Sequence, residues 1–493
     1  MKKQSFIHGA AVLAIASILC KIMSAAFKIP LDRLFLHEDG IGVYQSAYSV
    51  YNVFLAICVT GIPVALSSLI ASSKNEEEAQ GYAQSTFVYV SLFSLVASLA
   101  LFVFAQPLAR VLSGGGSPVA RYSLKALSPA LLVMGIISSR RGFFQGKGLM
   151  TPSAVSQLAE SGAKVVLGIG ICALTYKKGI EAGSAGAIAG VTIGAFFSAI
   201  VLEASFRKLK AQRVGADLGK ALKVLKLSVP MTLGAFAFTA VMLTDTLMVP
   251  KLLATSGIGQ AERLKLFGYL TRANTVYNLP ATIITAFTAS AVPAIAAVKG
   301  SAEKLSENCA RAIKLVLLAA FPSGIGMAIF SGDILSLLYN SSQHYTILAL
   351  CGAMVIIMPF IQTTTAMLQT LGKVWEPIGV TIGAVLIKII LNFVFVPMAG
   401  VEGAPLSTVI AFLPAAVINY ILVSNKVSLK GTFVVGVKLF ATALAACVGG
   451  WLIYMVRPGV KLFLVAMAFA AIIYGIVVVL SGTITKDEIS GKG

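Results

Sequence analysis

Residues 376–398 read EPIGVTIGAVLIKIILNFVFVPM, and this stretch decides the class of fold. A helix crosses a hydrocarbon core about 30 Å thick with about 20 predominantly apolar residues, so the stretch predicts a transmembrane helix. Lys388 lies near its middle. Because a charged side chain inside a membrane is costly, we expect Lys388 to face protein or water and to serve a function.

The composition of the whole chain agrees with this class. Of its 493 residues, 57% are hydrophobic and 12% are charged, whereas soluble proteins carry about 25% charged residues. The formal net charge is +20, from 39 Lys and Arg against 19 Asp and Glu. In a membrane protein this excess indicates basic loops on the cytoplasmic side. No basic patch interleaved with aromatic residues is present, so nucleic acid is excluded as a partner.

Further apolar stretches continue the pattern along the chain. We predict an all-α polytopic membrane protein of about 14 transmembrane helices. The expected spans are 6–30, 44–72, 84–106, 119–144, 151–176, 183–205, 222–250, 265–298, 309–331, 345–371, 376–398, 402–424, 431–455 and 460–481. The first resembles a signal peptide, but Lys21 and Lys28 interrupt it and apolar character resumes to Pro30. We therefore expect it to be retained as a helix.

Basic residues in the connections predict the orientation. The strongest basic run joins the sixth and seventh spans, and a second follows the eighth span. With an even number of spans, both runs lie on the side of Lys2, Lys3, Lys486 and Lys492. Connections 331–345 and 398–402, on the other side, have no Lys or Arg. The positive-inside rule therefore predicts both termini in the cytoplasm.

A weak internal repeat predicts two halves. Lys164 and Lys388 are 224 positions apart, as are Gly148 and Gly372. We expect an N-terminal lobe at 1–205, a basic cytoplasmic linker at 206–221, a C-terminal lobe at 222–424, and two extra helices with a cytoplasmic tail at 425–493. Six helices per copy make the repeats parallel, which places a substrate cavity between the lobes near the midplane.

The basic residues inside the spans predict an anion site in that cavity. The candidates for substrate binding are Lys21, Lys28, Lys164, Arg272 and Lys388. Arginine suits phosphate oxygens because it can bind them with two hydrogen bonds. Alternatives remain open, since Lys28 could reach the lipid headgroups.

Two acidic residues lie within the expected spans, and each has more than one possible role. Glu160 stands four residues before Lys164 and could neutralise it. Asp245 could pair with a lysine across the cavity or bind a coupling cation. The residues do not decide between these readings.

The segment 140–148, RRGFFQGKG, is the most conspicuous local motif. Its polar side chains, Arg140, Arg141, Gln145 and Lys147, predict a cytoplasmic mouth that receives an anionic headgroup. Interfacial anchoring is the alternative. The glycines do not form a phosphate-binding loop of the P-loop type, because the GKS or GKT ending is absent.

Catalysis and cofactors find no support in the sequence. The six cysteines are scattered singly and the three histidines lie far apart, so neither a metal site nor a nucleophile with its base is indicated. We expect no enzyme activity and no cofactor. Since no ATP motif is present, transport would be coupled to the membrane potential or to a cation gradient.

The motifs RGFFQGK at 141–147 and MTPSAVSQ at 150–157 resemble stage V sporulation protein B and its relatives. Shorter matches are Gly42–Tyr44, Gly61–Ala65 and Ser290–Ile295. This group belongs to the polysaccharide transporter branch of the multidrug/oligosaccharidyl-lipid/polysaccharide exporter superfamily and includes MurJ-type lipid II flippases. The resemblance covers essentially the whole chain.

The resemblance implies a flippase of the bacterial cell membrane for undecaprenyl-diphosphate-linked glycans, most simply lipid II for peptidoglycan synthesis. It implies essential cations in a central cavity beginning on the first helix, where Lys21 and Lys28 lie. Gram-negative flippases have a further Arg on the second helix, but residues 51–62 lack any basic residue here. The alternatives are export of a teichoic acid or capsule unit, or a drug/cation antiporter. We expect a monomer whose partners are a lipid-linked oligosaccharide and membrane lipids.

Overall fold

The computed structural model describes residues 6–209, 214–298, 300–456 and 458–481. Lys2, Lys3, Lys486 and Lys492, used above for the orientation, lie outside these residues, as do parts of the expected linker and tail. The side chains of most of the motif at 290–295 are likewise not described.

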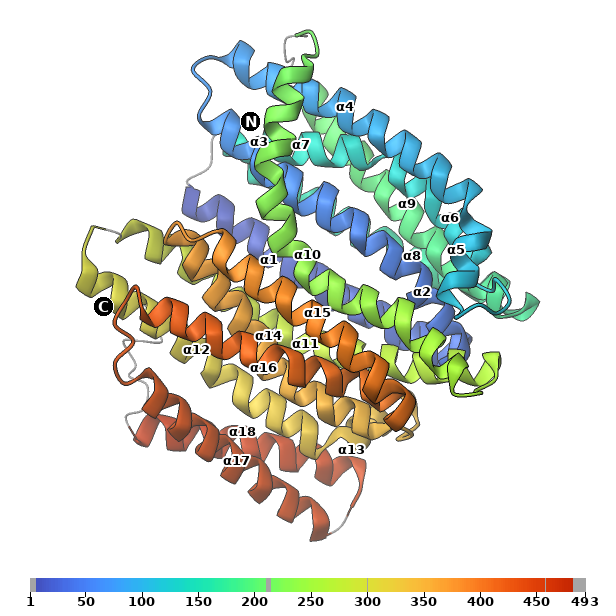
Figure 1. Ribbon diagram of the computed structural model, residues 1–493, viewed down its shortest axis with the longest axis vertical. Helices are drawn as coiled ribbons and strands as arrows, with labels where there is room; N and C mark the ends of the chain where they lie inside the picture. The colour runs from blue at the N-terminus through green and yellow to red at the C-terminus, as the bar shows by residue number, and fades with distance from the viewer. Residues whose placement is uncertain (1–5, 210–213, 299, 457, 482–493) are drawn as a thin grey trace. The chain divides into compact units, whose positions relative to one another are not determined.

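The described chain is helical throughout, as predicted, and contains two compact units, Met1–Thr271 and Arg272–Gly493 (Figure 1). The elements of the first unit are α1 (Phe6–Leu31), the π-helical turn η1 (Asp32–Leu36), α2 (His37–Leu55), the π-helical turn η2 (Ala56–Gly61), α3 (Ile62–Ala71), α4 (Glu76–Val103), α5 (Ala105–Leu112), α6 (Arg121–Leu132), α7 (Met134–Gly146), α8 (Met150–Thr175), the short 3₁₀ helix η3 (Tyr176–Lys178), α9 (Ile180–Arg207) and α10 (Leu218–Thr255). Helix α11 (Gln260–Ala297) crosses the boundary between the units.

The second unit continues with a similar set of long helices. They are α12 (Ala302–Ile329), α13 (Ser331–Tyr339), α14 (Tyr345–Thr370), α15 (Trp375–Ala399), the short η4 (Gly400–Glu402), α16 (Gly403–Ser424), α17 (Thr432–Val456) and α18 (Val460–Leu480).

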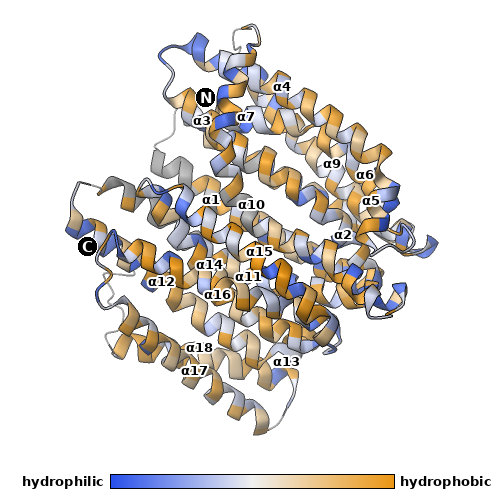
Figure 2. Ribbon diagram, in the orientation of Figure 1, coloured by the Kyte–Doolittle hydropathy of each residue, from blue (hydrophilic) through white to orange (hydrophobic). Residues whose placement is uncertain are grey.

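Long apolar helices carry the membrane character. Among the described residues, nine runs are long and apolar enough to cross a membrane, or ten if α6 and α7, bent by 42° against each other, count as one. The run Trp375–Ser424 contains two expected spans, and the run Ile15–Ala71 covers most of two others, 6–30 and 44–72. The expected spans 222–250 and 265–298 lie in α10 and α11, which are 38 residues each. In Figure 2 apolar residues follow the length of helices such as α4 and α17, while polar residues gather at helix ends and connections.

Close contacts between helices in the first unit depend on glycine residues, which have no side chain. Helices α8 and α9 pack along their length, and a Cβ on Gly190 would lie 2.2 Å from the Cα of Gly168. Only glycine permits backbones to approach so closely, as is common between membrane helices. This contact fixes the position of α8, which carries Lys164 and also packs on α1.

The compact units do not divide at 206–221. Helix α9 ends at Arg207 and α10 begins at Leu218, so a connection does lie there. However, α10 packs on η2, α3, α4 and α2 and thus belongs to the first unit by its contacts. The division into two repeated halves remains a prediction from the sequence.

Two turns in the chain have the same backbone pattern. At the end of α7, the amides of Lys147, Gly148 and Leu149 bond the carbonyls of residues 143, 145 and 144. At the end of α14, the amides of residues 371, 372 and 373 bond the carbonyls of 367, 369 and 368, each 224 positions later. Gly148 and Gly372 both have positive φ, +71° and +86°, the conformation that favours glycine. The identical offset agrees with the internal repeat.

Candidate functional site

Two lysines of the first unit flank one aromatic ring. Lys28 on α1 has its Nζ 5.5 Å from the centre of the Tyr48 ring, and Lys164 on α8 has its Nζ 5.9 Å from the same centre. The Lys28 ammonium donates to Oε1 of Gln45 at 2.9 Å. The Lys164 ammonium donates to Oγ of Ser24 at 2.6 Å. Helices α1, α2 and α8 thus bring two cations to one place, which we call the lysine pair.

A chain of hydrogen bonds fixes the amide that faces Lys28. Nε2 of Gln45 donates to Oγ of Ser49 at 3.1 Å, and Ser49 also accepts from Thr246 of α10 at 2.9 Å. Because the amide nitrogen of Gln45 is turned toward Ser49, its carbonyl oxygen is turned toward Lys28. The ammonium is therefore held by a neutral acceptor rather than by a carboxylate.

No carboxylate of the described residues forms an ion pair with Lys28 or Lys164. Glu160 is instead bound to Arg141 of α7 at 2.9 Å. Lys164 is 7% exposed, so its charge is largely removed from water without a counter-charge. Two such charges repel each other more strongly than they would in water. A dianionic group seated between them would relieve both effects.

Arg141 has a structural position in the first unit. Its guanidinium is buried between α7, α8 and α9, where it donates to Ser156 and Ser198 as well as to Glu160. A buried arginine with this many acceptors holds three helices together. It therefore does not line an open mouth in this structure.

The other residues of the motif at 140–148 point to different partners. Arg140 pairs with Glu203 of α9 at 2.9 Å, and Lys147 pairs with Glu76 at the start of α4. Gln145 is half-buried. All four predicted mouth residues lie on the last two turns of α7 or just after it. Their side chains nevertheless do not converge on one site.

The remaining candidates of the first unit are Lys21 and Asp245. Lys21 lies two turns before Lys28 on α1 and is exposed, with no ion pair to any described carboxylate. Asp245 on α10 is buried. The structure does not join either of them to the lysine pair.

The second unit holds Lys388 and Arg272. Lys388 on α15 is 0% exposed and donates to Oγ1 of Thr408 at 2.7 Å and to the carbonyl of Ala404 at 3.2 Å, both on α16. Lys164, its counterpart in the internal repeat, likewise donates to a hydroxyl of a neighbouring helix. Arg272 on α11 is buried, with its guanidinium 5.1 Å from the centre of the Tyr339 ring.

Sequence reasoning missed the partners of the lysine pair. Ser24, Gln45 and Tyr48 were not predicted as site residues. The signal that could have found them is the polar series Gln45, Ser46 and Ser49 within the apolar span 44–72, next to the motif Gly42–Tyr44. Polar side chains in a membrane helix face protein or water rather than lipid.

Comparison with known families decides the relationship. The model of the polysaccharide biosynthesis protein family matches residues 6–299. The chain belongs to this family. The resemblance noted in the sequence is thereby confirmed at the level of the family.

Two curated relatives from Bacillus subtilis (strain 168) agree with the assignment. Stage V sporulation protein B is 24% identical over 467 residues, which are 91% of this chain and 88% of that protein. Lipid II flippase MurJ is 23% identical over 474 residues, which are 90% of this chain and 87% of that protein. Curated proteins with those names thus match nearly the full chain.

Solved structures confirm the fold. The inward closed conformation of lipid II flippase MurJ matches with a TM-score of 0.75 at 16% identity, covering 94% of this chain and 97% of that one. An inward-facing MATE multidrug resistance transporter matches with a TM-score of 0.67 at 17% identity, covering 84% of this chain and 97% of that one. The family member described here is therefore an all-helical, multi-span membrane protein with a fold of transporters rather than of enzymes.

Proposed function

We propose that this chain is a flippase that moves an undecaprenyl-diphosphate-linked glycan from the inner to the outer leaflet of the bacterial cell membrane. Lipid II, carried for peptidoglycan synthesis, is the first candidate. The observation that carries the proposal is the lysine pair around Tyr48, which has no bound carboxylate among the described residues. A family match and a flippase among the relatives support it.

The chemistry of the lysine pair fits a diphosphate. A phosphate anion cannot enter hydrocarbon without its water unless fixed charges replace that water. Two ammonium groups on neighbouring helices carry six N–H donors, of which two are used by Gln45 and Ser24, and a diphosphate has acceptor oxygens at both ends. Tyr48 adds a ring against which a sugar or a phosphate-linked group could pack.

Alternating access completes the proposed mechanism. We infer that the headgroup is held in a central cavity by Lys21, Lys28, Lys164, Arg272 and Lys388, while the polyprenyl tail stays in lipid. Rocking of one half against the other would then open the site to the outer leaflet. With both termini in the cytoplasm, an inside-negative potential favours outward movement of negative charge by about 2.3 kcal/mol per charge per 100 mV.

Other classes of substrate can be compared by the groups that they would need at the binding site. A teichoic acid or capsule precursor carries the same diphosphate and differs only in its glycan. A drug/cation antiporter would need a carboxylate at the binding site. The lysine pair disfavours a cationic substrate, because its two charges repel one.

A transport assay tests the proposal. The purified chain is reconstituted into proteoliposomes, and the outward appearance of fluorescent lipid II is measured beside a teichoic acid precursor and a cationic dye. We expect transport of a diphosphate-linked glycan that is lost in the double variant Lys28→Gln, Lys164→Gln and kept in Lys125→Gln. Lys125 is a suitable control because it is an exposed lysine 5.3 Å from the centre of a different ring, that of Phe102. Transport of the dye alone, or full lipid transport by the double variant, would refute the proposed function.

A further inference from the structure

A cavity of about 1030 Å³ opens beside Arg140, apart from the lysine pair. It lies within the first unit between the start of α4, the end of α7 and the end of α9, and residues 214–216 close one side. Its polar lining comes from Gln80, Gln84, Arg140, Glu203 and Arg207. This volume is large enough for a phospholipid headgroup.

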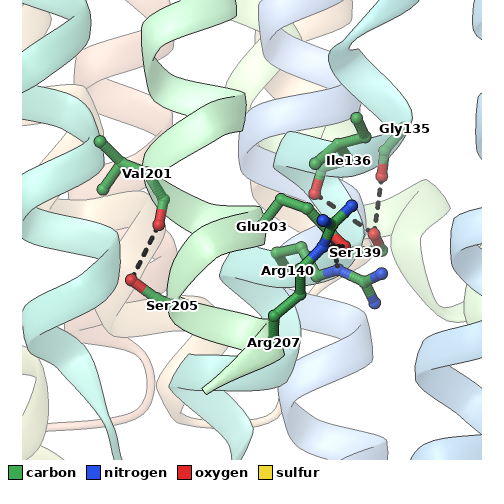
Figure 3. Close-up of polar contacts among 8 residues, drawn as sticks. All are labelled: Gly135, Ile136, Ser139, Arg140, Val201, Glu203, Ser205 and Arg207. Carbon is green, nitrogen blue, oxygen red and sulfur yellow. Dashed lines mark hydrogen bonds and ion pairs between the residues drawn. The ribbon is translucent and has the colours of Figure 1, made fainter. Parts of the chain in front are cut away.

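The charges of the cavity do not cancel. The Glu203 carboxylate receives Nε of Arg140 at 2.9 Å and Nε of Arg207 at 3.3 Å. Figure 3 shows the carboxylate between the two guanidinium groups. Two positive charges therefore share one negative charge, and the cavity keeps a net charge of +1. An anion of single charge would balance it.

Arg140 also has an unused donor. Arg140 is 4% exposed, and its buried Nη1 makes no hydrogen bond among the described residues. Rings of Phe206 and Phe87, with centres 3.6 Å and 4.8 Å from the guanidinium carbon, hold the group in place. Leaving a buried charged donor unpaired is unfavourable, so the positive charge of Arg140 is only partly compensated by Glu203.

The cavity lies near the end of a long apolar helix, which would place it at headgroup depth if α9 spans the bilayer. Glu203 is four residues before the end of α9, which is about 6 Å at a rise of 1.5 Å per residue. Headgroups occupy about 5 to 7 Å on each side of the hydrocarbon core. From the lining residue Val88, an exposed apolar stripe continues along α4 through Leu92, Val96 and Leu99. An acyl chain could therefore follow the helix away from the cavity.

We propose that the cavity between α4, α7 and α9 binds an anionic phospholipid, with its phosphodiester at Arg140 and Arg207 beside the Glu203 carboxylate and its acyl chain along the apolar stripe of α4. The two glutamines, Gln80 and Gln84, offer amide groups to a polar headgroup such as glycerol. This site is separate from the proposed transport site, and it stands whether or not lipid II is the substrate.

Lipid binding to the full-length protein tests the proposal. Native mass spectrometry in detergent measures the affinity for phosphatidylglycerol, with zwitterionic phosphatidylcholine as the matched lipid. We expect selective binding of phosphatidylglycerol, weakened about fivefold by Arg207→Gln, as for one basic residue near an anionic lipid. Arg110→Gln is the control, because Arg110 is an exposed arginine of the same unit that does not line the cavity.

The variant Glu203→Gln separates a binding site from a structural ion pair. Because the carboxylate competes with the phosphate for both arginines, its neutralisation should tighten phosphatidylglycerol binding several-fold. A purely structural role predicts unchanged or weaker binding in this variant. Equal binding of both lipids, equal effects of Arg207→Gln and Arg110→Gln, or competition by soluble glycerol phosphate at the same concentration as the lipid would each overturn the proposal.

Discussion

Replacement of Lys164 by methionine separates a binding role from a packing role. Methionine keeps much of the length of the side chain and removes the charge. Ser24 would lose the ammonium but still donate to the carbonyl of Cys20 at 2.9 Å, so no buried group is left unpaired. Since Lys164 has no ion pair with the described carboxylates, we expect Lys164→Met to leave the unliganded protein as stable as the wild type or more stable.

Ligand affinity should change in the opposite direction. A hydrogen bond to a charged group contributes about 1.5–3 kcal/mol, and about 1.4 kcal/mol corresponds to a tenfold change in Kd. Loss of the ammonium should therefore weaken binding of undecaprenyl diphosphate by about 10- to 150-fold. Lys28→Met should act similarly on affinity, but it leaves Oε1 of the buried Gln45 without its donor and should also lower stability.

Titration of the solubilised protein measures this effect. Undecaprenyl diphosphate is compared with undecaprenol, which has the same tail without the diphosphate, and Lys125→Met serves as the control variant. The thermal unfolding midpoint is recorded for each variant without ligand. Unchanged affinity in Lys164→Met, or an equal loss of affinity for undecaprenol, would refute the assignment of the diphosphate to the lysine pair.

Two stability predictions follow from the packing of the first unit. Gly190→Ala should lower stability by about 1–3 kcal/mol, because the new methyl group meets the backbone of Gly168. Gly170→Ala, where a Cβ meets nothing within 4 Å, should be neutral or stabilising, and equal thermal unfolding midpoints of the two variants would contradict the reasoning. Arg141→Met should cost about 3–5 kcal/mol by leaving Glu160 without its partner. Adding Glu160→Gln should recover part of this loss in the same assay, and no recovery would argue against the pair.

Much of the local structure could be predicted from the sequence. The turns at Gly148 and Gly372 lie in the short connections between expected spans, where a helix that ends with a left-handed residue favours glycine. The break between α6 and α7 was not predicted, and the expected span 119–144 is two helices bent by 42°. Pro129 lies four residues before this break, at Val133. Hydropathy alone does not register such a bend, because both pieces are apolar.

The candidate site was predictable only in part. Lys28 and Lys164 stood out because each is a charge within an apolar span, and hydrocarbon makes such a charge expensive wherever the rest of the chain lies. Their shared ring and their neutral acceptors come from α1 and α2, which neighbour α8 only in the folded protein.

The sequence by itself determined that this chain crosses a membrane and that it carries basic residues within its apolar spans. These properties follow from the composition of single segments, because the cost of placing a residue in hydrocarbon depends on that residue and its immediate neighbours. The tertiary structure decided which charged side chains pair with each other. Glu160 is four residues before Lys164 and could have paired with it. Its carboxylate instead pairs with Arg141 of α7, at a distance of 2.9 Å between Oε2 and Nη2. Lys164 is thereby left without a carboxylate partner among the described residues, since a pairing between helices depends on distances that no single segment contains.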